Sequence, residues 1–372
     1  MFDKCIINNV DIMKTYSLYL SLALFAMGLF SSCSSSGKEE VQDIQSLPVH
    51  PIETMEQYNQ QELITRNPWE FHRIGDNFFV FYGMPDYAAL VFRMSDCRQL
   101  GEFISMGGGP DECLTPRYAG CSAEEDTVYI YDTGKRKMLE VEVPSLQTDT
   151  LQYKVISENP SSGDDLYMMT SRLENGLTVS LRYSGTRHLF TLFDERMDSL
   201  CSFGSLPLPI EDDELKNFMH FQGIMTAEGN TVYFGCKSLP YLCAYEVNGK
   251  DDIRLKFSHN YLPTPYTYTD RLTIDYRGNT NSFRDIKICG GYIWTTFLGG
   301  STQFIIDELD GEGYAEHLLV FDKKDGTPLA KFKFPNKGGH ICFSKDGKEL
   351  YHFTVDTNID VVKMEDLLEI IE

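Results

Sequence analysis

The sequence lacks any C-x-x-C pair, although ten of its 372 residues are cysteines. Cysteines at that spacing are typical of structural zinc sites and of thioredoxin-like redox centres, so the sequence supports neither class. A disulfide across loops, Cys97 with Cys113 or Cys113 with Cys121, stays open. Most other cysteines lie inside apolar runs and are expected to be small buried side chains on strands: Cys121, Cys201, Cys236, Cys243, Cys289 and Cys342.

Positive charge is also scarce. The chain has 33 Lys and Arg against 55 Asp and Glu, a formal net charge of −22. Because nucleic-acid binding depends on Lys and Arg side chains that neutralise phosphates, this balance argues against a nucleic-acid partner. The sequence contains no Gly-Lys-Ser/Thr phosphate loop, and no Ser-His-Asp or paired-carboxylate arrangement can be recognised from spacing. We expect no cofactor.

Long apolar runs are absent except near the N-terminus. The run at residues 16–30 is about 15 residues long, whereas a membrane-spanning helix needs roughly 20. Lys14 precedes this run and Cys33 follows it, which resembles a bacterial lipoprotein signal with Cys33 as the acylated residue. Phe30 stands where Leu is commonest in that signal, and ordinary secretory cleavage with a free Cys33 thiol is the alternative. The acidic residues before Met13 are unlike a signal, so Met13 is the expected start.

The segment after Cys33 bears on location. Lys38-Glu39-Glu40, beyond a Ser-rich spacer, is similar to the tag that some Gram-negative lineages use to bring lipoproteins to the outer leaflet. We therefore expect an outer-membrane lipoprotein, either surface-exposed or facing the periplasm. The membrane is then a partner through the lipid anchor, because an acidic chain repels anionic headgroups.

A short turn separates two extended apolar runs six times along the chain. The turns recur with a period of about 50 residues, which is the mark of a repeat architecture. The runs around each turn are rich in aromatic and β-branched residues, and four can be found in five of the six units. The turns are Gly75-Asp76, Glu125-Asp126, Asn175-Gly176, Gly229-Asn230, Gly290-Gly291 and Asp346-Gly347.

This repeat predicts an all-β fold, a six-bladed β-propeller with four-stranded antiparallel blades. Tandem sandwiches would not sustain one period across the chain, and helix is expected only at 211–217 and 364–371. The chain divides into residues 1–32 (leader and lipoprotein signal peptide), 33–47 (lipidated Cys33 and flexible tether) and 48–372 (one propeller domain).

The sixth unit has a third run at Val361-Val362, and too few residues follow it for a fourth strand to be assigned. A ring needs closure, so we expect a strand from residues 48–65 to complete the last blade. The alternative is that residues 367–371 supply that strand themselves.

The segment Met106-Gly107-Gly108-Gly109-Pro110-Asp111-Glu112 lies at the first junction between blades. Together with the leader and the period, it resembles the TolB-like six-bladed propeller lipoproteins, whose Gly-x-Gly-Pro-x-Glu stretch corresponds to Gly107, Gly109, Pro110 and Glu112. The resemblance implies a surface or periplasmic propeller without an assigned reaction. The glycines are expected to serve a tight connection rather than a phosphate site, because no helix with amides aimed at an anion follows them.

Binding residues are expected at the end of the ring where the long loops emerge, since rigid scaffolds carry their sites on loops. Those loops are predicted at 159–165, 204–217, 258–282 and 299–316. Inner-strand polar residues and loop aromatics are the candidates: Arg117, Tyr118, His220, Gln222, Tyr266, Tyr268, Arg271, Arg284, Asp285 and His340. We predict no dedicated metal site, because the acidic stretch 307–312 does not have EF-hand spacing.

Two functions follow. The first is a lipid-anchored extracytoplasmic module that binds or scaffolds a protein, peptide or glycan through its long-loop face. The alternative is a propeller enzyme, a metal-dependent hydrolase, lyase or lactonase, with its metal near Asp285 and His340 at the channel mouth. The sequence favours a binding protein over an enzyme.

Overall fold

Six tight turns reverse the chain between an inner strand and its neighbour, and each contains one residue with a positive φ. Glycine holds this conformation in five turns and Glu125 in the sixth. A positive φ costs a residue with a Cβ roughly 1–2 kcal/mol, which explains why glycine recurs there. The φ values are 57° at Gly75, 60° at Glu125, 81° at Gly176, 59° at Gly229, 63° at Gly290 and 68° at Gly347. These are the six turns that the sequence predicts.

The computed structural model describes residues 43–53, 55–59, 68–82, 85–110, 112–162, 166–182, 188–208, 221–268, 272–275, 277–308 and 314–371. All of them belong to one unit, Gln42–Glu372. The predicted leader, Cys33 and the helix at 211–217 therefore lie outside the described residues. Within the described part of the chain, no helix is long and apolar enough to cross a membrane.

Four separate four-stranded antiparallel sheets follow one another along the chain. The first contains β3 (Glu70–Ile74), β4 (Asn77–Phe81), β5 (Tyr87–Arg93) and β6 (Gln99–Ser105), and the second β7 (Pro116–Cys121), β8 (Thr127–Asp132), β9 (Lys137–Glu142) and β12 (Val155–Pro160). The third contains β13 (Tyr167–Arg172), β14 (Thr178–Arg182), β15 (His188–Phe193) and β16 (Ser199–Ser205), and the fourth β17 (Gly223–Glu228), β18 (Thr231–Cys236), β19 (Tyr241–Gly249) and β20 (Asp252–Asn260).

The remaining main strands form one continuous eight-stranded sheet, which the sequence does not predict. It contains β23 (Phe283–Cys289), β24 (Tyr292–Phe297), β25 (Ala315–Asp322), β26 (Pro328–Phe343), β27 (Glu349–Thr354) and β28 (Ile359–Lys363), together with two N-terminal strands. The 16-residue β26 joins its two parts. Pro328–Lys333 pairs mainly with β25, whereas Gly338–Phe343 pairs with β27.

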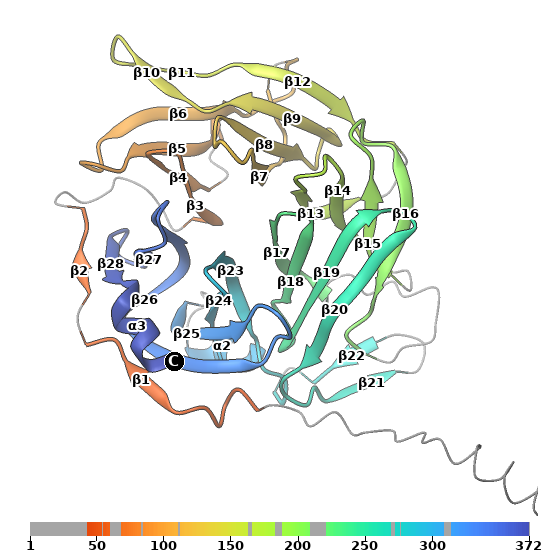
Figure 1. Cartoon of the computed structure of the whole chain (residues 1–372), viewed down its shortest axis with the longest axis vertical. Coiled ribbons are helices and arrows are strands. Elements are labelled where there is room, and N and C mark those ends of the chain that lie inside the picture. The colour runs from red at the N-terminus through yellow and green to blue at the C-terminus, as the bar shows by residue number, and fades with distance from the viewer. Residues whose placement is uncertain are drawn as a thin grey trace, which may run out of the picture. The chain divides into compact units, whose positions relative to one another are not determined.

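The sheets stand in a ring, with the first strand of each four-stranded sheet innermost (Figure 1). The innermost strands are β3, β7, β13, β17, β23 and the second half of β26. They run in the same direction, because their first residues meet at one end and the six turns meet at the other. Ile341 N donates to Asp285 Oδ2 at 3.0 Å near the strand starts, and Arg73 Nε donates to the Phe343 carbonyl at 3.0 Å near the turns. We call these the loop end and the turn end of the ring.

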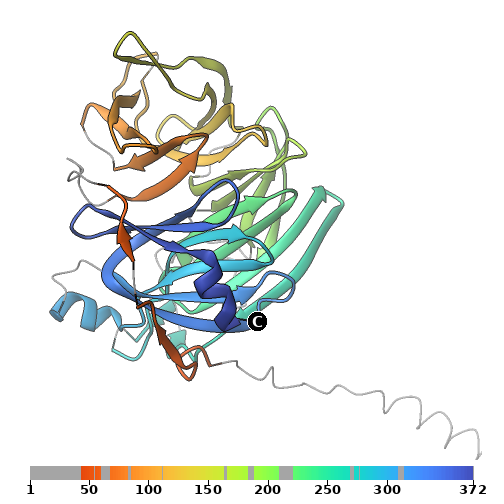
Figure 2. The ribbon, with the colours of Figure 1, turned by 60° about the vertical axis from the view of Figure 1, so that its left-hand side comes forward.

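The N-terminal segment pairs with the C-terminal strands, as Figure 2 shows. β2 (Glu56–Gln57) pairs antiparallel with β28, and β1 (Val49–Pro51) pairs parallel with β26. Asn59 extends the first contact, since its Oδ1 accepts from Ile359 N at 2.7 Å. β2 lies within the range 48–65 that the sequence predicts for the closing strand. The alternative is wrong, because residues 367–371 belong to the helix α3 (Met364–Ile371).

The core consists of apolar and aromatic side chains between neighbouring sheets. Phe71 packs against Phe353 with ring centroids 5.3 Å apart, which joins the first sheet to the last strands. Phe190 packs against Phe234 at 5.5 Å, which joins the third sheet to the fourth. Of the eight described cysteines, all unpaired, Cys113, Cys236, Cys243 and Cys342 are buried and Cys97, Cys121, Cys201 and Cys289 are half-buried. Neither of the two candidate disulfides, Cys97 with Cys113 or Cys113 with Cys121, is therefore formed. Cys121, Cys201 and Cys289, which the sequence predicts to be buried, are only half-buried.

Three small elements decorate the ring. A hairpin of β10 (Ser145–Gln147) and β11 (Thr150–Gln152) lies between β9 and β12. A second hairpin, β21 (Tyr266–Tyr268) with β22 (Leu272–Ile274), and the helix α2 (Thr302–Glu308) occupy two of the predicted long loops. Three of the predicted loops, 159–165, 204–217 and 258–282, begin later than predicted, because β12, β16 and β20 continue to Pro160, Ser205 and Asn260. Continued strand pairing satisfies backbone groups that a loop would leave to solvent.

Candidate functional site

A cavity of ≈ 630 Å³ lies between the inner strands and includes residues of β3, β7, β13, β17, β23 and β26. A second cavity of ≈ 440 Å³ lies toward the turn end and shares His72, Tyr118 and Lys287 with the first. Both volumes are in the range of small-molecule sites. The inner strands therefore enclose a channel that is lined by four of the polar residues predicted for it, Tyr118, Arg284, Asp285 and His340.

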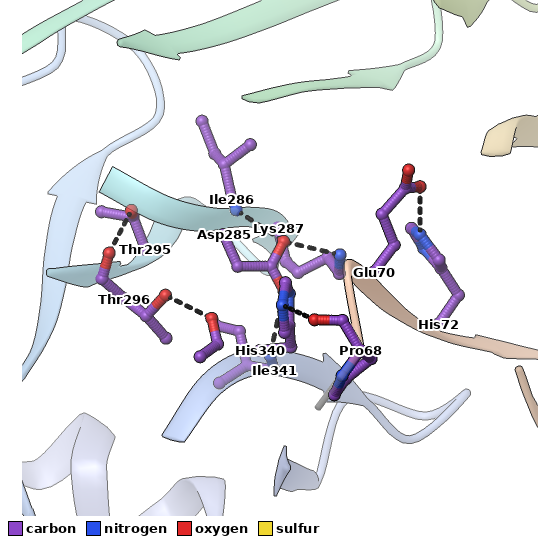
Figure 3. Close-up of polar contacts among 11 residues, drawn as sticks. Pro68, Glu70, His72, Asp285, Ile286, Lys287, Thr295, Thr296, His340 and Ile341 are labelled. Carbon is purple, nitrogen blue, oxygen red and sulfur yellow. Dashed lines mark hydrogen bonds and ion pairs between the residues drawn. The ribbon is translucent and has the colours of Figure 1, made fainter. Parts of the chain in front are cut away.

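Asp285 on β23 is the centre of a buried polar network in this channel (Figure 3). Its Oδ1 accepts from Ile286 N at 2.8 Å and from Lys287 Nζ at 2.9 Å, and its Oδ2 accepts from Ile341 N. His340 Nε2 lies 3.0 Å from the Pro68 carbonyl oxygen, and its Nδ1 lies 3.5 Å from Asp285 Oδ2. Burial alone would raise the pKa of Asp285, but Lys287 and His340 together hold it well below its usual range.

A second pair lies on β3, where His72 Nε2 donates to Glu70 Oε2 at 3.2 Å. Burial lowers the pKa of His72 to about 4, so the imidazole is neutral near pH 7. Burial alone would raise the pKa of Glu70, but its contacts with His72 and Arg117 lower it. Tyr118 stacks on His72 with ring centroids 3.8 Å apart. The channel wall on this side is therefore a fixed aromatic and carboxylate surface.

Three cationic side chains gather at the loop end. Arg117 NH1 lies 3.7 Å from Glu70 Oε1, and its guanidinium lies over the Trp69 ring at 4.3 Å. Trp69 lines the larger cavity and is 48% exposed. Arg284, next to Asp285, lines the same cavity.

Lys237 follows β18, and its backbone binds the starts of β17 and β23. Its N donates to the Gln222 carbonyl and its carbonyl accepts from Ser282 N, both at 2.8 Å.

Lys237 is electrostatically coupled to the other loop-end groups. Burial, together with the charges on Arg284 and Arg117, lowers the pKa of its ammonium to about 8, against the opposing effect of Glu70 and Asp285. Burial also lowers the pKa of Arg284. Sequence reasoning missed Lys237 and Trp69. The only sequence signal for Lys237 was its position. It stands between the second and third strands of its sheet, and connections of this kind emerge at the loop end.

The turn end carries charges of both signs. Glu124, Glu174 and Glu228 lie in or next to the turns and line the larger cavity. Glu125 is held by Arg73, whose NH1 donates to Glu125 Oε2 at 2.9 Å, and by Lys345 at 3.6 Å. Arg73, Arg172 and Lys345 also line the two cavities near this end, and Lys323 pairs with Glu228. The channel is therefore cationic where the inner strands begin, whereas acidic and basic side chains are mixed where they end.

The Gly-rich junction has a structural role. Glu112 Oε2 accepts from Gly109 N at 2.7 Å, and Lys135 Nζ donates to the carbonyls of Gly109 and Glu112. Gly107 has a φ of 153°, and a Cβ there would lie 2.2 Å from Glu112 Oε2. The loop is thus filled by its own glutamate, which fits the predicted junction and leaves no cradle for a phosphate.

The structure brings together part of the predicted set. Tyr118, Arg284, Asp285 and His340 line the larger cavity, the guanidinium of Arg117 lies over the Trp69 ring, and the Gln222 backbone binds Lys237. Tyr266 is 36% exposed on β21 and is not among the residues that line either cavity. The structure describes Tyr268 through its backbone, which ends β21. His220 and Arg271 lie outside the described residues.

The donors at the channel mouth do not fit a metal centre. Lys287 Nζ already binds Asp285 Oδ1, backbone amides bind both carboxylate oxygens, and His340 Nε2 faces a carbonyl. A divalent cation would have to displace an ammonium ion to reach this carboxylate. Across the described ranges no group of three or more His, Cys, Asp or Glu could hold a metal ion. The described geometry therefore does not support a metal-dependent hydrolase, lyase or lactonase at Asp285.

No protein-family model matches the sequence, and no curated protein sequence matches it. The fold is similar to that of a member of the DUF4221 family from Bacteroides vulgatus, with a TM-score of 0.53 and 9% identity over 83% of this chain and 95% of that chain. It is also similar to a candidate exported protein from Bacteroides fragilis, with a TM-score of 0.51 and 8% identity over 83% of this chain and 93% of that chain. At such identities the similarity establishes the fold alone. The resemblance to TolB-like lipoproteins stays a prediction.

Proposed function

We propose that this protein is an extracytoplasmic binding module whose site is the channel mouth at the loop end. The observation that carries the proposal is the cavity lined by the exposed indole of Trp69 and by polar side chains from several inner strands. Strands paired on a rigid ring hold these groups in place, which lowers the entropic cost of binding. The ligand is a protein, peptide or glycan.

We also propose that the ring has six blades of the TolB-like type. The eight-stranded sheet divides at β26, whose first half completes a blade with β23, β24 and β25. The second half begins another blade with β27, β28 and β2. With the four separate sheets this makes six blades. An experimental structure in which the strands after β23 form a single blade would contradict the count.

We also propose that the module is an outer-membrane lipoprotein, surface-exposed or periplasmic, held by acylation of Cys33. The leader pattern and the acidic chain support this, because a chain of net charge −22 has no electrostatic attraction to an anionic bilayer. Cells fed a clickable fatty acid should label the wild type and not Cys33→Ser, and the variant should leave the membrane fraction. Equal labelling of both would overturn the anchor.

Ligand binding is tested with the full chain in detergent on glycan and peptide arrays. Trp69→Ala should lose the ligand retained by the wild type, because it removes the exposed ring of the mouth. Leu255→Ala is the matched control, since Leu255 is 54% exposed on β20 and does not line either cavity. Equal retention by wild type and Trp69→Ala, or none by the wild type, would overturn the proposed site.

A further inference from the structure

We infer that the channel mouth binds the carboxylate of an acidic saccharide through Arg117, Lys237 and Arg284. This inference deepens the proposed function and rests on it. It names the ligand class, and it assigns the specificity to Lys237 and Arg284 rather than to Trp69.

The first support is the excess of positive charge at the loop end. Arg117, Lys237 and Arg284 supply three cations there, against two carboxylates, Glu70 and Asp285, of which Asp285 is already paired with Lys287. The whole chain has the opposite balance, with −22. Cations held close together repel one another, and an anion that binds between them relieves this repulsion.

The second support is that both carboxylates are already engaged. Asp285 is bound by Lys287 and two backbone amides, and Glu70 is bound by His72 and lies near Arg117. Within the described part of the chain, neither Lys237 nor Arg284 forms an ion pair. These two cations are therefore available to a ligand carboxylate, which an arginine fork binds with two parallel hydrogen bonds.

The third support is the pKa of Lys237, which burial and the neighbouring guanidinium groups of Arg284 and Arg117 lower to about 8. The groups that face it are Glu70 on β3, Arg117 on β7, and Arg284 and Asp285 on β23. A bound carboxylate would stabilise the ammonium form and raise this pKa again.

The saccharide follows from Trp69. Its indole lines the cavity and stays almost half exposed although Arg117 covers part of it. A pyranose presents a flat apolar face of C–H groups that fits an aromatic ring, and a sugar acid places a carboxylate beside that face. Lys237 and Arg284 lie at the loop end, where the inner strands begin, so the ligand enters from that end.

The test uses the full chain in detergent on an array that pairs each uronic-acid or sialic-acid glycan with its carboxyl-reduced counterpart, next to acidic peptides. We expect retention of acidic glycans and a loss of at least about tenfold in affinity for their reduced partners, since a charge-assisted hydrogen bond is worth that much. Equal affinity for both members of the pairs would overturn the inference, and so would retention of acidic peptides alone. The proposed function would survive either result if Trp69→Ala still abolished binding.

Variants test the residues. Lys237→Met and Arg284→Met should each weaken acidic-glycan binding about tenfold and leave any binding to reduced glycans unchanged. Lys256→Met is the control, because Lys256 is exposed on β20, away from the channel lining. Unchanged affinity in both mouth variants would overturn the inference.

Lys237→Arg keeps the inference testable if the methionine variants do not fold. Wild-type affinity should fall by up to about tenfold between pH 7 and pH 9, as Lys237 loses its proton, whereas Lys237→Arg should bind equally at both pH values. The same pH dependence in Lys237→Arg and wild type would overturn the role of Lys237. Absence of all binding would overturn the inference and the proposed function together.

Discussion

Single residues decide the connections between the sheets of this ring. Gly107 adopts a φ of 153°, and the space where a Cβ would stand is taken by the carboxylate of Glu112. That carboxylate in turn accepts from Gly109 N, so three residues of the motif depend on one another. The motif is explained by packing at a junction.

Gly107→Ala should destabilise the protein by about 2 kcal/mol or more, because the Cβ combines an unfavourable φ with displacement of Glu112. Gly108→Ala is the matched control, since nothing lies within 4 Å of its Cβ position, and it should change stability by less than about 0.5 kcal/mol. Urea unfolding of both variants measures the difference. Equal stabilities would show that the motif does not constrain the junction.

His352 on β27 is fully buried and stacks on Phe334 with ring centroids 3.8 Å apart, and neither ring nitrogen has a hydrogen-bond partner. Burial lowers its pKa to about 3. The unfolded chain binds this proton near pH 6.5, so the folded state loses stability as pH falls below that value, by up to about 1.4 kcal/mol per pH unit.

His352→Phe should therefore unfold at higher urea concentration than the wild type, and the advantage should grow between pH 7 and pH 4.5. His50→Phe is the control: His50 also lies beside an aromatic ring, Phe332, but is partly exposed. An advantage that does not change with pH would mean that His352 is not kept neutral in the folded state.

At the scale of elements, the N-terminal segment joins the two ends of the chain. β2 pairs with β28 and β1 with β26, while Tyr58 packs its ring against Phe78 and Tyr351. These contacts tie the first sheet to the last strands.

Removing residues 43–59 should abolish the single cooperative thermal transition, because β28 would then present an unpaired edge and the seam would open. A chain that begins at Gln42 is the control and should melt as the wild type does, since the compact unit begins there. Circular dichroism melts compare the two. An unchanged melt of the shorter chain would refute closure through the N-terminus.

At the scale of the whole molecule, charge opposes stability. With 55 acidic and 33 basic residues the folded chain repels itself, and the repulsion is weakest where salt screens it. Exposed pairs such as Arg93–Asp96 weaken in salt too, but pairs of this kind contribute little.

We therefore expect the Tm to rise when NaCl increases from about 10 mM to about 150 mM, where the Debye length falls from about 30 Å to about 8 Å. Choline chloride at equal ionic strength should have the same effect, which separates screening from binding of a specific cation. A Tm that falls with salt would show that attractive ion pairs dominate the electrostatics of the fold.

Much of this molecule follows from local sequence. Glycines at five of the six turns and alternating aromatic and β-branched runs predict the strands, because backbone conformation at a turn and burial on a sheet depend on residue type. The helix at 364–371 follows for the same kind of reason. Arg117, Arg284, Asp285 and His340 could be proposed for the channel because they stand on strands whose place in each repeat is known.

Other features depend on contacts between segments far apart in the chain. The continuity of β26 across two halves, the parallel pairing of β1, and the engagement of Asp285 by Lys287 and Ile341 have no local signal. Lys237 is the clearest case, since its lowered pKa arises from burial and from guanidinium groups on other sheets. The repeat alone determined the strands and the turns, whereas the charge of the channel mouth was decided by tertiary structure, because electrostatic interactions depend on distance in space rather than along the chain.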